Sequence, residues 1–263
     1  MRRSFLFAVC FSLWILAAAP LAHANGVFQS VRGDVRAAAG TAAPTSVAAN
    51  QQIVPGTTVT TGPGAQTIIR FDDGHTVVLN ENTEFRINQY SFDKDKPQSD
   101  NVALQLLKGA MRSVSGLIAS RSQQAFALLA PQATIGIRGT DFMIALVNPA
   151  YLSVLQGTIS ASNAAGTASF AAGATATVAS STTLAAAIPA SALPPSVAST
   201  FSNLGSVAIG AAGAGAGAAS GAAAGGISAG MVAAGVAMVG VAAAAASSSS
   251  GEQQMTTTTV TTH

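Results

Sequence analysis

The sequence predicts an all-β domain of many short strands, a sandwich or a β-roll, followed by a low-complexity Ala/Gly-rich tail with helical character. Between residues 25 and 180, short β-branched or alternating apolar segments are separated by turn residues. Their spacing is close to the roughly 8 to 12 residues that is typical of all-β domains. Apart from Glu252, charge is confined to residues 1–141, because residues 142–251 contain no Asp, Glu, Lys or Arg.

The first 24 residues predict a signal peptide for export. Arg2 and Arg3 precede an apolar run, and small residues follow at the expected cleavage site, so the mature chain should begin at Asn25. Cys10 is the single cysteine of the chain and would leave with the signal, which excludes an internal disulfide. Ten basic and ten acidic residues then remain, so no basic surface for nucleic acid is predicted.

The clearest hairpin signal is Asp72-Asp73-Gly74, which lies between the apolar runs 67–71 and 75–79. An Asp-Gly pair in this setting indicates a tight turn, because glycine adopts positive φ at little cost. Residues 84–88 alternate with period two, as in a strand with one face in a core.

Several elements after this hairpin follow from apolar runs and glycines. Residues 103–108 and 110–114 bracket Gly109, which suggests another hairpin, and Gly157 is expected to separate two later strands. Residues 91–101 are expected to form an exposed loop, and a short helix is expected within 113–124. Further strands are predicted at 125–129, 134–137, 142–147, 151–155, 158–162, 168–171 and 175–178.

The predicted β domain covers residues 25–183, and three segments of simpler composition follow it. Residues 184–204 contain three prolines and predict a linker. Residues 205–247 are almost entirely small or apolar, and 248–263 predict a disordered Ser/Thr tail. Within 205–247, glycines recur every fourth residue, a spacing that allows close packing of helices: Gly213, Gly217, Gly221 and Gly225.

Two interpretations of residues 205–247 remain open. Residues 229–246 are 18 uncharged residues, at the threshold for a membrane-spanning helix, and packed glycines would then support an oligomer. The segment is poor in Leu, Ile and Phe, however, and no Lys or Arg follows it. The alternative is a low-complexity tail that never inserts.

Catalytic and metal-binding groups are scarce in the mature chain. Its two histidines are His75 and His263, and it has no cysteine, so neither a typical zinc site nor a cysteine nucleophile is expected. The adjacent carboxylates Asp72 and Asp73 are explained by their hairpin, and His75 is expected to be a solvated hairpin histidine. We therefore predict no enzymatic activity, no cofactor and no metal.

The segment 133–142 (ATIGIRGTDF) places one arginine and one aspartate in an apolar, glycine-punctuated pattern. Arg138 is interpreted as an internal tie, with its donors satisfied by carbonyls or a carboxylate; the alternative is a contact with a partner. Asp141 is expected to cap a turn. The residues assigned to this motif are Gly136, Arg138, Gly139, Thr140 and Asp141.

In order and spacing, five segments of the chain resemble the FecR domain, over residues 26–178. The segments are 27–35, 56–62, 70–74, 106–109 and 133–142. The resemblance implies a β-rich periplasmic domain that contacts an outer-membrane receptor. Regulators of this family also carry a short cytoplasmic domain that handles a sigma factor. No room for it is expected before the signal peptide, so the resemblance implies an exported stand-alone member.

These observations predict a non-enzymatic protein of the periplasm or cell envelope with a binding or scaffolding domain. A protein or glycan of the envelope is the expected partner, and the C-terminal tail is expected to provide membrane association or self-assembly. The alternative function is a signalling component that senses an outer-membrane receptor and relays to a sigma-factor system. That alternative requires residues 205–247 to carry the signal across the inner membrane.

Overall fold

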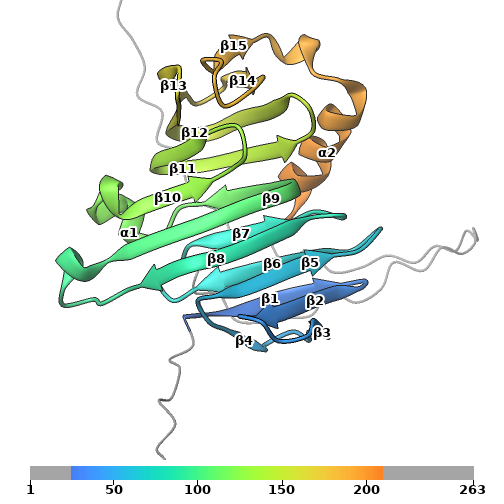
Figure 1. Cartoon of the computed structure of the whole chain (residues 1–263), viewed down its shortest axis with the longest axis vertical. Coiled ribbons are helices and arrows are strands. Elements are labelled where there is room, and N and C mark those ends of the chain that lie inside the picture. The colour runs from blue at the N-terminus through green and yellow to red at the C-terminus, as the bar shows by residue number, and fades with distance from the viewer. Residues whose placement is uncertain (1–24, 210–263) are drawn as a thin grey trace, which may run out of the picture. The chain divides into compact units, whose positions relative to one another are not determined.

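The computed structural model of the protein describes residues 25–209, in which fifteen strands join in one continuous sheet (Figure 1). The strands are β1 (Gly26–Arg32), β2 (Val35–Ala39), β3 (Thr45–Ser46), β4 (Gln52–Ile53), β5 (Thr57–Thr61), β6 (Gln66–Phe71), β7 (Thr76–Leu79), β8 (Glu84–Ser91), β9 (Asn101–Val114), β10 (Phe126–Leu129), β11 (Thr134–Leu146), β12 (Ala150–Asn163), β13 (Gly166–Ala171), β14 (Thr175–Val178) and β15 (Ala186–Ile188). The helices are α1 (Leu117–Arg121) and α2 (Pro195–Ser206), with short 3-10 turns at Pro97–Ser99, Gln123–Ala125 and Ala190–Ala192. The predicted all-β fold is confirmed.

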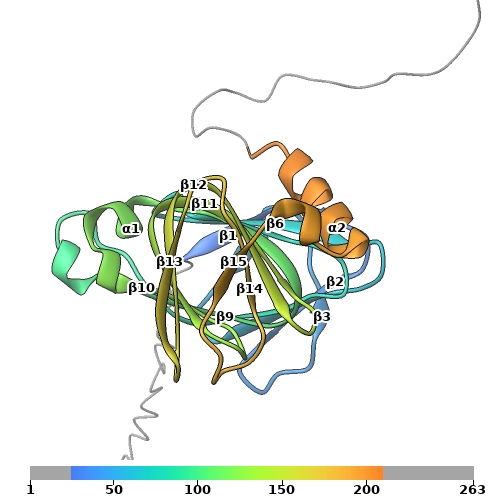
Figure 2. The same cartoon turned by 90° about the horizontal axis from the view of Figure 1, so that it is seen from above.

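The long strands β9, β11 and β12 change neighbours along their length, which folds the sheet into two layers (Figure 2). The first half of β9 pairs with β8 and β10, whereas its second half pairs with β7 and β11. In the same way, β12 pairs with β14 through its first half and with β13 through its second. We call the layer that contains β6, β7 and β14 the helix-side layer, because α2 packs on its outer face.

Glycines mark the points where the long strands pass from one layer to the other. Gly109 in β9, Gly139 in β11 and Gly157 in β12 all have positive φ, at 88°, 57° and 74°. The register between β11 and β12 also shifts beside Gly139, between Arg138 and Asp141. The predictions of separate strands around Gly109 and Gly157 were therefore wrong. A glycine with positive φ serves a bulge as well as a tight turn, and the two share one sequence pattern.

Gly157 is constrained by close packing as well as by its positive φ. A Cβ at this position would overlap the carbonyl oxygen of Gly139, whereas a Cβ at Gly173, also at positive φ, would meet open space. We expect Gly157→Ala to lower the free energy of unfolding by about 1 to 3 kcal/mol more than Gly173→Ala. Urea unfolding of both variants measures this difference, and equal losses would contradict close packing at the crossing.

The core consists of two apolar clusters on opposite sides of the helix-side layer. The larger lies between the layers and includes the fully buried rings of Phe28, Phe85 and Phe142. The smaller lies under α2, where Val197, Phe201 and Leu204 cover side chains of β7, β9 and β11. The strand β7 is consequently buried on both faces.

Helix α2 and strand β15 lie in the segment 184–204, which the sequence predicted to be a linker. That prediction was wrong, because the prolines begin a helix here. Pro195 occupies the first helical turn, where its missing N–H needs no partner. Val197, Phe201 and Leu204 then follow at helical spacing and form the buried face.

Several predictions lie outside the described residues. They are the signal peptide 1–24, the glycine series Gly213, Gly217, Gly221 and Gly225, the part of 205–247 beyond residue 209, and the tail 248–263. Within residues 25–209, neither helix has the length and apolarity needed to cross a membrane.

Candidate functional site

The decapeptide 133–142 contributes to a buried ion pair, but not through its arginine. Asp141 in β11 accepts hydrogen bonds on both carboxylate oxygens from Arg112 in β9, at 2.9 Å from Nε and 2.6 Å from Nη2. The two side chains are only 13% and 11% exposed. A two-pronged guanidinium–carboxylate contact of this kind fixes orientation as well as charge.

The same guanidinium holds the C-terminal end of α2. Arg112 Nη1 lies within 3.1 to 3.2 Å of the carbonyl oxygens of Leu204, Gly205 and Val207. The last carbonyls of a helix have no partner within it, and a positive charge at this end is favourable. We call Arg112, Asp141 and these three carbonyls the latch, because together they fasten the end of α2 to the sheet.

Arg138 lies elsewhere and does not act as the predicted internal tie. Its side chain is exposed, and it forms no hydrogen bond or ion pair with any other residue between 25 and 209. Asp141 does not cap a turn, since its carboxylate is paired with Arg112. Thr140 is buried and donates its backbone N–H to Ser115 Oγ at 2.8 Å. Gly136 faces Ser160 across the ladder, and Ser160 Oγ leaves too little room for a Cβ there.

The turn Asp72-Asp73-Gly74 connects β6 to β7, with the N–H of Gly74 donating to Phe71 at 2.9 Å. Asp73 is 3% exposed and accepts from the Tyr90 hydroxyl at 2.9 Å and from the N–H of His75 at 3.0 Å. Its second carboxylate oxygen accepts from the N–H of Ile118 in α1 at 3.2 Å. The turn therefore fastens β8 and α1 to this end of the sheet.

His75 is buried, which contradicts the predicted solvated histidine. It is 1% exposed, its Nε2 lies 3.0 Å from Ser113 Oγ, and its ring stacks on Phe126 at 5.2 Å. Burial lowers the pKa of His75 to about 4, although the nearby Asp73 opposes this shift. Burial also raises the pKa of Tyr90, and the charge of Asp73 adds to the rise.

An aspartate, a histidine and a serine thus lie together, but not in the arrangement of a hydrolase triad. Asp73 contacts the backbone N–H of His75 and not its ring, so it cannot orient the imidazole as a triad acid does. Asp73, His75 and Ser113 are each 3% exposed or less, which leaves no access for a substrate. Among residues 25–209, no group of three or more metal-ligating side chains could hold a metal ion. We interpret this cluster as structural.

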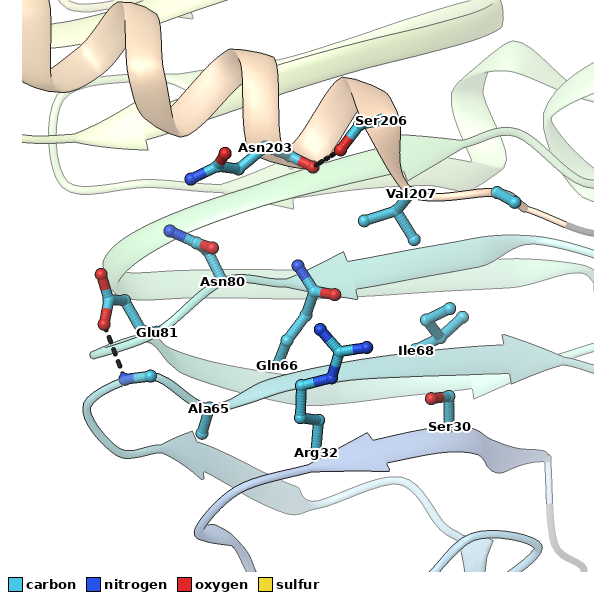
Figure 3. Close-up of a pocket in the computed structure, with 12 residues that line it drawn as sticks. Ser30, Arg32, Ala65, Gln66, Ile68, Asn80, Glu81, Asn203, Ser206 and Val207 are labelled. Atoms are coloured by element: carbon cyan, nitrogen blue, oxygen red, sulfur yellow. Dashed lines mark hydrogen bonds between the residues drawn. The ribbon is translucent and has the colours of Figure 1, made fainter. Parts of the chain in front are cut away.

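A groove of about 550 Å³ lies between the helix-side layer and the C-terminal end of α2 (Figure 3). Its floor is formed by β1 and β6, and one end is formed by the segments around Gly64 and Glu81. Glu81 accepts a hydrogen bond from the N–H of Gly64 at 2.6 Å, which joins these two segments. The polar side chains that line the groove are Ser30, Arg32, Gln66, Asn80, Glu81, Asn203 and Ser206.

Besides Ser30, four of these side chains have unused hydrogen-bonding groups. In Figure 3, the side chains of Arg32, Gln66, Asn80 and Asn203 extend into the space between β1 and α2. None of the four forms a side-chain hydrogen bond to another residue in the part of the chain that the structure describes. Donors and acceptors from two strands, a turn and a helix therefore converge without internal partners, as in a ligand-binding surface.

Sequence analysis did not identify the groove residues. Gln66, Asn80 and Asn203 are ordinary surface residues in their local patterns. The pairing of β6 with β7 brings Gln66 and Asn80 together, and the docking of α2 adds Asn203. Arg32 belongs to the tripeptide Arg32-Gly33-Asp34, and Gly33 has the positive φ of a turn, at 74°.

Comparison with known proteins identifies one family. A family model described as "FecR protein" matches residues 57–160, from β5 into the second half of β12. No curated protein matches the chain. Two solved structures of a candidate anti-sigma factor from Parabacteroides distasonis are similar, with sequence identities of 15% and 13% and TM-scores of 0.40. Each comparison covers 50% of this chain, which spans 58% of the length of those proteins.

Proposed function

We propose that this chain, whose residues 57–160 match the FecR family model, is a non-enzymatic regulatory protein of the cell envelope whose β domain binds a partner. The observation that carries the proposal is the groove beside α2, where four polar side chains lack internal partners. The buried state of Asp73, His75 and Ser113 supports a role without catalysis. Export is supported by the signal-like sequence of residues 1–24.

The groove is a suitable recognition surface because its two sides are held in place. The latch fastens α2 on one side, and Glu81 fastens the turn at Gly64 on the other. Binding groups that are already positioned lose less conformational freedom when a ligand arrives.

Capture from envelope extracts tests this proposal. The full mature chain and the variant Asn203→Trp are immobilised, and bound protein and glycan are identified. Asn203 is exposed on α2 and lines the groove, so an indole there should fill the groove without disturbing the core. Ser202→Trp is the matched control, because Ser202 is exposed on the same helix but does not line the groove.

We expect the unsubstituted chain and the Ser202→Trp variant to capture the same partner. The Asn203→Trp variant should lose this partner. A chain that captures no reproducible partner, or a partner retained equally by both variants, would contradict the groove as the recognition surface.

A signalling role is the second candidate, and the position of α2 favours it. Asn203, Ser206 and Val207 line the groove, while the carbonyls of Leu204, Gly205 and Val207 are held by Arg112. A ligand in the groove would therefore contact the segment that leads into residues 210–263, so binding and docking of α2 are thermodynamically linked. Deletion of residues 210–247 should then abolish a receptor-dependent transcriptional response; an unchanged response would exclude this role.

A further inference from the structure

We propose that the groove beside α2 binds a carboxylate-bearing glycan. This inference rests on the proposed function, in which the β domain binds an envelope partner, and specifies the chemical class of the ligand. It follows from the charge of the groove, from the type of polar group that lines it, and from the pairing of the strands in its floor.

The groove offers one free positive charge. Arg32 is the only basic residue in its lining, and its side chain forms no ion pair with any carboxylate in residues 25–209. Glu81, the one acidic residue among the described residues that line the groove, is engaged by the N–H of Gly64 at the end of the groove. A guanidinium in this position presents parallel donors that match a carboxylate.

The remaining polar groups match hydroxyl and acetamido groups. Gln66, Asn80 and Asn203 each carry a planar amide with donors on one side and an acceptor on the other. Adjacent sugar hydroxyls can both donate and accept, so they can satisfy such amides in pairs. Ser30 in the floor and Ser206 in α2 add hydroxyl groups.

An extended peptide fits the groove less well. Strand β6 is hydrogen-bonded to β1 on one side and to β7 on the other, so it has no free edge for an added strand. Strand β1 pairs with β4 only at Gly26 and Val27, but its remaining open edge is on the side away from β6. The apolar lining consists of Ala65, Ile68, Val207 and Ala208, which offers no deep pocket for a large side chain. Nucleic acid is disfavoured as well, because its affinity depends on several cations and the groove has one.

Calorimetric titration of the full mature chain tests the proposal. The probes are the galacturonic acid trimer and the disaccharide of N-acetylglucosamine and N-acetylmuramic acid, both of which carry carboxylates. The neutral galactose trimer, which lacks carboxylates, is the control for charge. Tri-aspartate, which carries carboxylates on a peptide, is the control for the sugar framework. We expect saturable binding of at least one acidic sugar, with a dissociation constant of about 1 mM or tighter.

Substitution of the arginine supplies the decisive comparison. Arg32→Gln should weaken binding of the acidic sugar at least tenfold, whereas Arg36→Gln should not change it, because Arg36 is exposed on β2 and lies outside the groove. Asn80→Ala should weaken binding by a smaller factor. Unchanged thermal unfolding of Arg32→Gln would verify that the exposed substitution leaves the fold intact.

The proposal is overturned if neither acidic sugar binds, or if Arg32→Gln binds as tightly as the original chain. Equal binding of the galactose trimer would remove the role of the carboxylate, and tighter binding of tri-aspartate would assign the groove to acidic peptides. These results remain distinct from failure of the proposed function. A chain that still captures an envelope partner through the groove, but binds neither sugar, would refute only the ligand class.

Discussion

Replacing Asp141 with alanine should lower the free energy of unfolding by about 3 kcal/mol, because it leaves the charge of Arg112 uncompensated in a nearly buried site. The value lies at the lower end of the range for fully buried pairs, since Arg112 and Asp141 keep 13% and 11% of their side-chain surface. Urea unfolding of the full mature chain, followed by circular dichroism, measures this loss.

Asp34→Ala is the matched control for Asp141→Ala. Asp34 also pairs with an arginine, Arg36, but both side chains are 55% exposed, so its removal should produce no measurable change. Similar losses in the two variants would contradict the special role of the buried pair.

A second consequence of the latch concerns α2. Arg112→Met removes the donor that contacts the carbonyls of Leu204, Gly205 and Val207, so amides in α2 should exchange with deuterium faster. Amides of β5, which pairs with β2 and β8 and contacts neither α2 nor the latch, should keep their exchange rates. Unchanged exchange in α2 would show that apolar packing alone holds the helix.

Acidification should destabilise the protein through His75. The pKa of His75 is about 4 in the folded chain, below its ordinary value of 6.5, because burial disfavours the charged ring. Between these two values the unfolded chain binds a proton that the folded chain does not. The stability contributed by the neutral ring is therefore fully present above pH 6.5 and is lost as the pH falls toward 4, by a total on the order of 3 kcal/mol.

The free energy of unfolding, measured in urea from pH 7.5 to 4, tests this prediction against the variant His75→Gln. Glutamine can still hydrogen-bond Ser113 but does not titrate, so its stability should vary much less over this interval. Equal pH dependence in the two chains would contradict the role of His75.

Local patterns were sufficient to predict the fold class and the main turns. Asp73 and Gly74 form a turn wherever apolar strands flank them, because glycine at positive φ is a local requirement. The same local rule failed at Gly109 and Gly157, where positive φ serves a crossing between layers. Which of the two uses applies depends on the neighbouring strands, and these are distant in the sequence.

The polar sites could not be predicted for the same reason. Arg112 and Asp141 are 29 residues apart and meet only through the pairing of β9 with β11, so Arg138 was the nearer candidate for the tie. His75 follows a turn and was expected to be solvated, but Phe126 of β10 stacks on its ring and Ser113 of β9 contacts its Nε2. The groove depends on α2, and the small residues and prolines of this segment led to the prediction of a linker instead of a helix.

The most direct test of the groove as the recognition surface is site-specific photo-crosslinking in envelopes. A photo-reactive residue is placed at position 203, inside the groove, or at position 202, which is exposed on the same helix outside it. Figure 3 shows the Asn203 side chain on the side of α2 that borders the groove. We predict a discrete crosslinked partner from position 203 and none from position 202. Crosslinks of equal yield at both positions, or none at 203, would contradict the groove as the binding surface of this protein.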